Sequence, residues 1–182
     1  GDYRIIGNST PRFKYGITLD AAWKGFDFSI FMQGIGKRDL WLDGCYFWGA
    51  NGQGNEWQST GFTEHWDFFR PEGDPLGANL NSYYPRVNFS GGRNTKIQTR
   101  YLQNGAYLRL KNVQLGYTLP RVWTEKAGIS SVRVYVSGDN LATITSLSKI
   151  FDPEATGSLA GTGSGKLYPL QRVISVGVNV NF

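Results

Sequence analysis

The side chains with the greatest capacity to bind a ligand lie in the middle of the chain, where no regular pattern is visible. Six aromatic residues there are candidates for contact with a substrate or a partner: Trp41, Trp48, Trp57, Trp66, Tyr83 and Tyr84. A flat apolar ring complements the C–H face of a pyranose, so stacking on a sugar is one interpretation. The other is that these rings form the small core of a long folded loop, because tryptophan is commonly buried. The sequence leaves both interpretations open.

Residues that could ligate a metal or perform catalysis are few. His65 is the only histidine and has acidic neighbours, yet one histidine and the single Cys45 do not make a convincing zinc site. Asp152 and Glu154 offer carboxylate oxygens, but their spacing is more typical of a turn. The sequence contains no nucleophile elbow, no paired-carboxylate motif and no phosphate-binding loop. We therefore predict no enzyme activity, no catalytic residue, no bound metal and no cofactor.

The composition is typical of a β protein. The chain has 182 residues, of which 15% are aromatic and 24 are glycine. No run approaches the ~20 apolar residues of a membrane-spanning helix. The formal charge is +5, from 19 basic and 14 acidic residues, and the basic residues are scattered along the chain. We therefore do not expect a nucleic-acid partner.

The elements that position the loop aromatics show a period of two, most clearly at the end of the chain. From Ile174 to Phe182 every even position is apolar, and the odd positions are Ser, Gly and Asn. Such alternation predicts a strand with one apolar and one polar face. At ~3.3 Å per residue the apolar row is roughly 26 Å long. Tilted by about 40°, it would cross roughly 20 Å of bilayer, which is typical of a transmembrane barrel strand.

Four further segments alternate in the same way, so the sequence predicts five strands. They lie near residues 13–23, 26–34, 106–119, 131–139 and 172–182. Lys24–Gly25 predicts a tight turn between the first two. The apolar phase changes across Lys111–Asn112, which predicts a β-bulge. Between the third and fourth strands we expect a helical turn at 124–127, ended by Gly128.

The connections between these strands alternate in length. Those after the first and third strands are about two and about eleven residues long, whereas segments 35–103 and 140–170 are long. Short turns on one side and long loops on the other are typical of bacterial outer-membrane barrels. We therefore expect 35–103 and 140–170 to be extracellular loops, the first of them folded. Five strands cannot close a barrel, so an all-β, antiparallel transmembrane β-barrel fragment is predicted.

Several motifs in consecutive order resemble one known family. They are Ile6–Gly16, Lys24–Leu40, Tyr107–Pro120, Val134–Leu141, Phe151–Glu154 and Tyr168–Phe182. Together they are similar to the C-terminal barrel segment of SusC/RagA-type TonB-dependent transporters of Bacteroidota. The resemblance implies that residues 1–182 are the last five strands of a larger barrel of about 22 strands with a plugged lumen. We accordingly expect the chain to be a fragment of something longer.

The resemblance also implies a function. Such transporters import nutrients across the outer membrane, commonly a glycan or oligosaccharide and sometimes a peptide. A SusD-like surface lipoprotein acts as their lid, and the TonB complex supplies energy through the N-terminal part of the receptor. The six loop aromatics would then lie where lid and substrate meet. Phe182 resembles the terminal aromatic residue that the barrel-assembly machinery reads, and the other partners would be outer-membrane lipid and the remainder of the barrel.

A second interpretation is a soluble β-sandwich, such as a carbohydrate-binding module. It would account for the tryptophan-rich loop and the alternating strands. It would not account for the terminal Phe182 or for the alternation of short and long connections. A sandwich strand also usually carries Lys, Glu and Thr on its water-facing side, and the last strand carries Ser, Gly and Asn instead.

Overall fold

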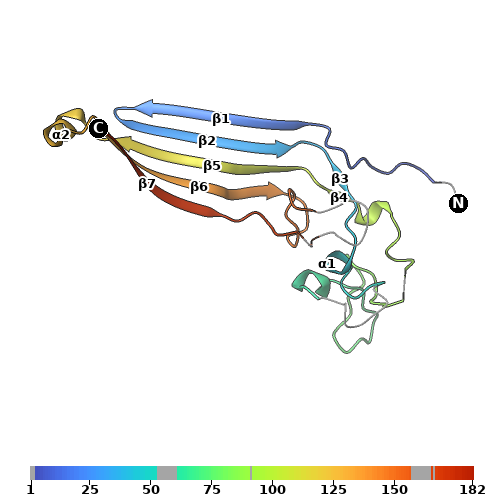
Figure 1. Ribbon diagram of the computed structural model, residues 1–182. Coiled ribbons are helices and arrows are strands. Elements are labelled where there is room, and N and C mark those ends of the chain that lie inside the picture. The colour runs from blue at the N-terminus through green and yellow to red at the C-terminus, as the bar shows by residue number, and fades with distance from the viewer. Residues whose placement is uncertain (1–2, 53–60, 91, 157–164, 166) are drawn as a thin grey trace. The chain divides into compact units, whose positions relative to one another are not determined.

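The computed structural model describes residues 3–52, 61–90, 92–156, 165 and 167–182 (Figure 1). The chain divides into two compact units. The sheet unit comprises residues 11–38, 105–146 and 170–182, and the loop unit comprises residues 1–10, 39–104 and 147–169.

The sheet unit is a single antiparallel sheet of five long strands. They are β1 (Lys14–Trp23), β2 (Phe26–Ile35), β5 (Tyr107–Thr118), β6 (Ser131–Thr145) and β7 (Val173–Asn181). Their order in the sheet is β1-β2-β5-β6-β7, so each long strand pairs with the next one along the chain (Figure 1). The prediction of an all-β antiparallel fold is confirmed.

The strand register places apolar and polar side chains on opposite faces in the part of the sheet next to the Lys24–Gly25 turn. One row of paired residues across all five strands is apolar: Ala21, Phe28, Leu115, Val136 and Val176. The row two residues further along is also apolar: Trp23, Phe26, Tyr117, Val134 and Val178. The row between them lies on the opposite face: Ala22, Asp27, Gly116, Tyr135 and Gly177. Because paired residues of an antiparallel sheet share a face, the sheet has one apolar and one largely polar side.

The apolar face is open. Val176 is 72% exposed, and Phe28, Leu115 and Val136 are exposed as well. A β-sandwich would bury this face against a second sheet. The described residues form only one other sheet, in which β3 (Asp39–Leu40) pairs with β4 (Gln103–Asn104) over two residues each. The β-sandwich interpretation therefore does not describe this fold.

Both short connections have the geometry that their residues predict. Lys24 and Gly25 have φ angles of 46° and 89°, as a two-residue hairpin turn of type I′ requires. Between β5 and β6 lie α2 (Arg121–Thr124) and the short 3₁₀ helix η4 (Glu125–Ala127). Gly128 ends this segment with a φ of 70°, so the predicted helical turn is confirmed.

The predicted bulge is present, and it explains one error of the sequence prediction. Leu110 pairs with Ala142 and Asn112 pairs with Asp139, so the register shifts across Lys111. Asn140 stands opposite this bulge with a φ of 52°. The predicted fourth strand stopped at residue 139, but β6 continues to Thr145. It does so because regular pairing resumes beyond the bulge, and residues 140–145 therefore belong to the strand rather than to the loop 140–170.

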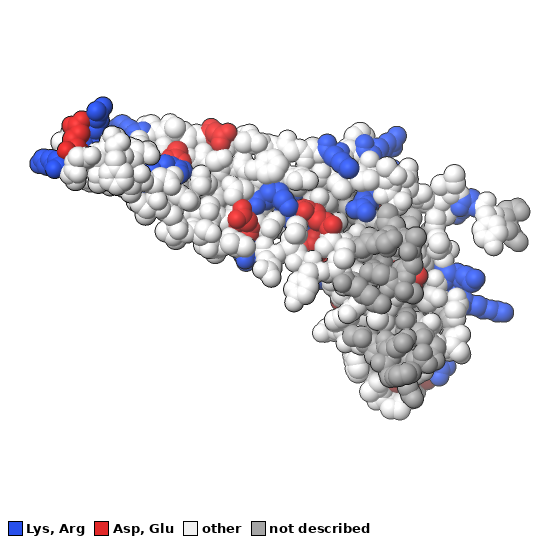
Figure 2. All heavy atoms as spheres, in the orientation of Figure 1, with Lys and Arg blue, Asp and Glu red and all other residues white. Residues whose placement is uncertain are grey.

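The loop unit contains short helices around an aromatic core. They are α1 (Cys45–Trp48), η2 (Thr63–Trp66) and η3 (Thr99–Tyr101). None of the helices in the described residues is long and apolar enough to cross a membrane. The basic side chains do not gather into one patch on the face that Figure 2 shows, where charges of both signs stand in separate spots.

Candidate functional site

The aromatic residues singled out in the sequence mostly build the core of the loop unit. Its buried cluster comprises Leu40, Leu42, Phe47, Trp48, Tyr84, Tyr101, Leu147 and Phe151. Trp41 and Tyr83 are partly buried and pack against this cluster. Trp66 is 60% exposed. Trp57 lies outside the described residues.

Trp48 is the centre of this core. It is 1% exposed, and its ring lies 5.1 Å from that of Phe47 and 4.8 Å from that of Tyr101, both edge to face. The Trp41 ring lies 5.9 Å away. Aromatic pairs in these arrangements are favourable beyond the area that they bury. The core interpretation of the loop aromatics therefore holds for Trp48 and Tyr84.

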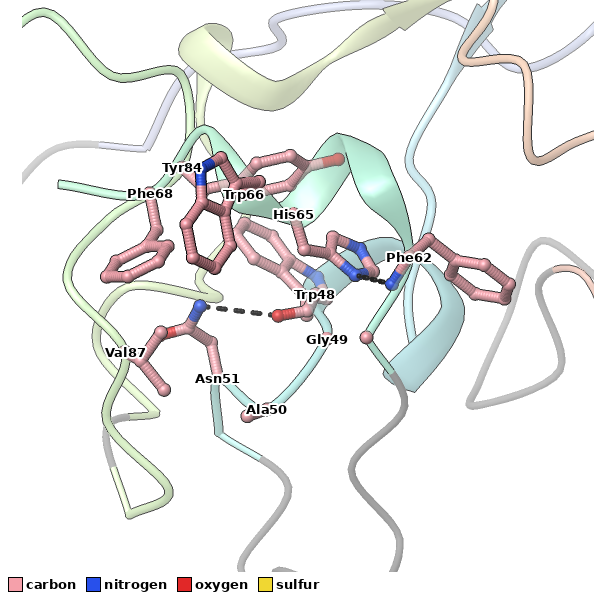
Figure 3. Close-up of a pocket in the computed structure, with 11 residues that line it drawn as sticks. Trp48, Gly49, Ala50, Asn51, Phe62, His65, Trp66, Phe68, Tyr84 and Val87 are labelled. Atoms are coloured by element: carbon pink, nitrogen blue, oxygen red, sulfur yellow. Dashed lines mark hydrogen bonds between the residues drawn. The ribbon is translucent and has the colours of Figure 1, made fainter. Parts of the chain in front are cut away.

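The core also forms one wall of a pocket of about 220 Å³ (Figure 3). Its lining brings together three of the six sequence candidates, Trp48, Trp66 and Tyr84. The other lining residues are Gly49, Ala50, Asn51, Gly61, Phe62, His65, Phe68 and Val87. Trp41 and Tyr83 do not line this pocket. The sequence analysis did not name Phe62, Phe68, Asn51 or Val87 as candidates for ligand contact. The high density of aromatic residues in 62–69 could have indicated the first two.

His65 is a structural member of this pocket. Its Nδ1 accepts a hydrogen bond of 3.0 Å from the Phe62 amide, so Nε2 carries the proton and donates to the Phe47 carbonyl at 3.0 Å. Burial lowers the pKa of His65, and the hydrogen bond to Phe47 opposes this shift in part. The neutral ring therefore connects η2 to α1. No group of His, Cys, Asp and Glu in the described residues is arranged to hold a metal ion.

Arg70 stiffens the wall that contains Trp66. Its Nε donates to the Gly77 carbonyl at 2.8 Å, and a terminal nitrogen donates to the Trp66 carbonyl at 2.9 Å. The guanidinium carbon lies 5.4 Å from the Trp66 ring centre and 4.8 Å from that of Phe68. Cation–π contacts and two carbonyl acceptors together hold this buried cation in place.

Polar contacts connect distant segments around the pocket. The Asn51 side chain donates to the Trp48 carbonyl at 3.3 Å and accepts from the Asn88 amide at 3.1 Å. Glu64 accepts from the Ser148 hydroxyl at 2.6 Å and from the Lys149 amide at 3.1 Å. Residues 147–150 are thereby joined to η2, although more than eighty positions separate them along the chain. The loop unit is therefore a folded module.

Tyr84 and Tyr83 remain neutral phenols. Burial raises the pKa of Tyr84 well above its ordinary value, and burial also raises that of Tyr83, whose hydroxyl accepts from Gln103 at 2.7 Å. A second, more open hollow of about 400 Å³ lies on another side of Tyr84 and includes Arg86 and Arg100. Arg100 donates to the Ser82 carbonyl at 2.6 Å. What the first pocket offers chemically is aromatic surface, and among the described residues that line the two hollows no nucleophile is activated by a base.

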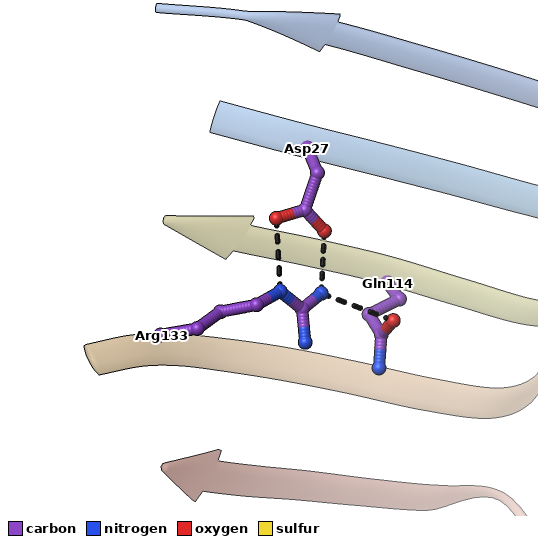
Figure 4. Close-up of polar contacts among 3 residues, drawn as sticks. All are labelled: Asp27, Gln114 and Arg133. Atoms are coloured by element: carbon purple, nitrogen blue, oxygen red, sulfur yellow. Dashed lines mark hydrogen bonds and ion pairs between the residues drawn. The ribbon is translucent and has the colours of Figure 1, made fainter. Parts of the chain in front are cut away.

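The polar face of the sheet carries a separate constellation (Figure 4). Arg133 on β6 binds Asp27 on β2 through both carboxylate oxygens, with Nε to Oδ1 at 2.9 Å, and reaches Gln114 on β5 at 3.2 Å. The pair crosses β5 at Gly116, where a Cβ would lie 2.5 Å from the guanidinium and the carboxylate. A side chain at this position would displace the ends of the Arg133 and Asp27 side chains and disturb their contact. The contact links three strands and satisfies both charges on the polar side.

Comparison with known proteins gives related sequences. No family model matches the chain. It is 32% identical over 191 residues to TonB-dependent receptor P3 of Formosa agariphila, and 28% identical over 191 residues to TonB-dependent receptor P26 of the same bacterium. All of the chain is covered in both alignments, and it spans 17% and 18% of those two proteins.

Solved structures give the same result for the fold. The RagAB peptide importer in its open-open state superposes with a TM-score of 0.71 and 26% identity, covering 98% of this chain and 18% of that one. Its closed-closed state gives a TM-score of 0.71 and 27% identity with the same coverage. The predicted barrel fold is confirmed by these matches.

Proposed function

We propose that this chain, a barrel segment of the SusC/RagA type of TonB-dependent receptor, forms part of the wall of a nutrient importer in the bacterial outer membrane. The single observation that carries the proposal is the exposed apolar face of the sheet, on which entire rows from β1 to β7 consist of aliphatic and aromatic residues. Such a face is stable against lipid, and the polar opposite face suits the lumen of a barrel.

The proposed orientation follows from the connections. The Lys24–Gly25 turn and the α2–η4 connection lie on the periplasmic side, and the loop unit lies outside the cell. Short periplasmic turns and long extracellular loops are general in such barrels. The loop unit, with its aromatic pocket, then lies on the side of the membrane from which cargo arrives. Cargo is an oligosaccharide or a peptide, and the similar RagAB structure is that of a peptide importer.

The proposed partners are those of the family. A SusD-like surface lipoprotein covers the extracellular side, where Trp41, Trp48, Trp57, Trp66, Tyr83 and Tyr84 are candidates for contact with it or with cargo. The TonB complex acts on parts of the receptor outside this chain. Lipid and the remaining barrel strands complete the surroundings of the sheet.

The test uses the complete receptor that contains this chain, tagged in its native host. We expect it in the detergent-extracted outer membrane, with a surface lipoprotein identified by mass spectrometry in the purified complex. Energised nutrient uptake is expected to stop when the receptor gene is deleted. A receptor recovered from the soluble fraction, or unchanged uptake of every nutrient tested after the deletion, would contradict the proposal.

Phe182 provides a separate test of barrel assembly. It is 90% exposed beside the end of β7, so its loss removes little packing from the sheet. Deleting Phe182 from the complete receptor is expected to reduce its amount in the outer membrane several-fold, because we propose that the barrel-assembly machinery reads this aromatic residue. Phe182→Tyr is the matched control and retains assembly. Normal insertion of the deletion variant would argue against this role.

A further inference from the structure

We propose that the 220 Å³ pocket between Trp48, Phe62, Trp66 and Phe68 is an anchor site for one large apolar side chain of a peptide cargo. This inference rests on the proposed import function and specifies its cargo class. Aromatic rings of this kind can also stack on sugar rings, so the polar groups and the size of the pocket decide between the two kinds of ligand.

The polar side chains of His65 and Asn51 around the pocket already have partners. Both ring nitrogens of His65 are used within the protein, and both ends of the Asn51 amide are as well, whereas the buried indole Nε1–H of Trp48 has no hydrogen-bond partner in the described part of the chain. None of the described residues that line the pocket is acidic or basic at neutral pH, because burial keeps His65 neutral. A sugar that enters carries several hydroxyl groups, and each hydroxyl left unpaired weakens binding. An apolar side chain needs no such partner.

The volume of the pocket also favours a single side chain. Pockets for whole small molecules measure about 300–1,000 Å³. A pocket of about 220 Å³ is smaller than this range and suits a single Leu, Met or Phe side chain. The remainder of the ligand would then lie outside the pocket, as the backbone of a peptide does when one residue is anchored.

Contacts within the protein hold the aromatic walls of the pocket in place. Arg70 stacks on Trp66 and Phe68 and binds two carbonyl groups, while His65 holds Phe62 through its amide. An aromatic wall fixed before binding lowers the ordering cost when a ligand enters. Trp66 is 60% exposed at this wall, so its ring can contact a ligand.

The experiment measures binding to the complete receptor, purified in detergent together with any lipoprotein that accompanies it. The probes are fluorescein-labelled nonapeptides of Gly and Ser that differ only in the central residue, which is Leu, Phe or Gly, and unlabelled maltohexaose as a competitor. We expect the Leu and Phe peptides to bind at least tenfold more tightly than the Gly peptide. Maltohexaose is expected not to displace them.

Two pairs of variants assign the preference to this pocket. Trp66→Ala is expected to weaken binding of the Leu peptide three- to tenfold and to leave the Gly peptide unaffected. Trp123→Ala, the same change at a tryptophan of the sheet unit that is 65% exposed, is expected to have no effect. Gly61→Leu adds a side chain to the lining at a position where a Cβ would meet no atom within 4 Å. This variant should abolish the preference for the Leu peptide over the Gly peptide. Gly92→Leu, equally unhindered but outside the lining, is the control.

The outcomes separate this inference from the proposed function. Equal affinity for the Leu and Gly peptides, or a preference that Trp66→Ala and Gly61→Leu both leave intact, would overturn the anchor site. So would displacement by maltohexaose that depends on Trp66. In each of these cases extraction from the outer membrane and co-purification of a lipoprotein would still support import. Absence of the receptor from the outer membrane would instead overturn import itself.

Discussion

The two units of this chain use apolar residues in opposite ways. In the sheet unit most large apolar side chains are exposed, as Trp23 is at 69%, and backbone pairing between five strands defines the structure. In the loop unit a cluster of large apolar side chains is buried, as Trp48 is at 1%, and packing of aromatic rings defines the structure. The loop unit is built like a water-soluble domain. The sheet unit is built for a surrounding of hydrocarbon on one side.

This contrast leads to different sensitivities. In the loop unit, loss of a buried ring leaves a cavity, and a change at the exposed rim costs little. In the sheet unit, the cost of a charge depends on which face it occupies. The following substitutions in the complete receptor test these statements, from the largest expected effect to the smallest.

Trp48→Ala is expected to destabilise the loop unit by about 3–5 kcal/mol, the usual cost of truncating a fully buried large aromatic residue. Hydrogen exchange measured by mass spectrometry should show faster exchange in residues 39–52 and 61–104 and unchanged exchange in the five strands. Trp66→Ala, at an exposed tryptophan, serves as the control and should leave both units protected. Loss of protection in the strands would show that the two units do not fold separately.

Val176→Arg is expected to cost about 2–4 kcal/mol when the receptor folds into lipid bilayers, because this position faces hydrocarbon. The neighbouring Ser175→Arg places the same side chain on the polar face, where it pairs with Ser137, and should cost much less. Urea titration of folding into vesicles gives both values. Equal costs for the two variants would indicate that both faces meet water.

Arg70→Met is expected to destabilise the loop unit by about 1–3 kcal/mol. The apolar stem is retained, but the carbonyls of Gly77 and Trp66 lose their donor in a partly buried setting. Local hydrogen exchange over residues 61–80 measures the effect. The control is Phe69→Leu, at the residue directly before Arg70, whose side chain makes neither of these hydrogen bonds. Unchanged protection in Arg70→Met would show that the guanidinium does not hold the wall.

The smallest expected effect is a dependence on pH confined to the loop unit. Burial places the pKa of His65 below its ordinary value near 6.5, so the unfolded chain binds more protons as the pH falls through that value. The stability contributed by neutral His65 is therefore present above about pH 7 and declines as the pH falls from 6.5 towards the lower pKa of the folded state. Protection of the Phe62 amide, corrected for intrinsic exchange, should decrease between pH 7.5 and 5.5. Protection in the strands should stay constant, and a constant Phe62 signal would contradict the assigned role of His65.

Most of the sheet could be predicted from the sequence, because each strand has its own period-two pattern. The bulge was predictable as well, since the change of phase at Lys111 is a local signal. The end of β6 was not. Asn140 interrupts the alternation with a left-handed backbone conformation, and only pairing with β5, which is far away in sequence, restores the strand beyond it.

The loop unit could be predicted only in outline. The density of aromatic residues indicated a folded loop, but no periodicity indicates which rings meet. The contacts that define the pocket join distant positions, such as Asn51 with Asn88 and Glu64 with Ser148. The acidic neighbours of His65 made it a candidate metal ligand in the sequence. In the structure its nitrogens serve backbone groups instead, which composition alone could not indicate.

The most direct test of the central claim is a scan of β7 by spin labelling of the complete receptor in outer membranes. Each position from Ile174 to Val180 is replaced by cysteine in a background in which Cys45 and any other cysteine are replaced by serine, and accessibility to oxygen and to a water-soluble nickel complex is measured. We predict a period of two, with labels at 174, 176, 178 and 180 accessible to oxygen in lipid and labels at 175, 177 and 179 accessible to the nickel complex. Accessibility to the nickel complex without alternation would contradict the assignment of this sheet as a barrel wall.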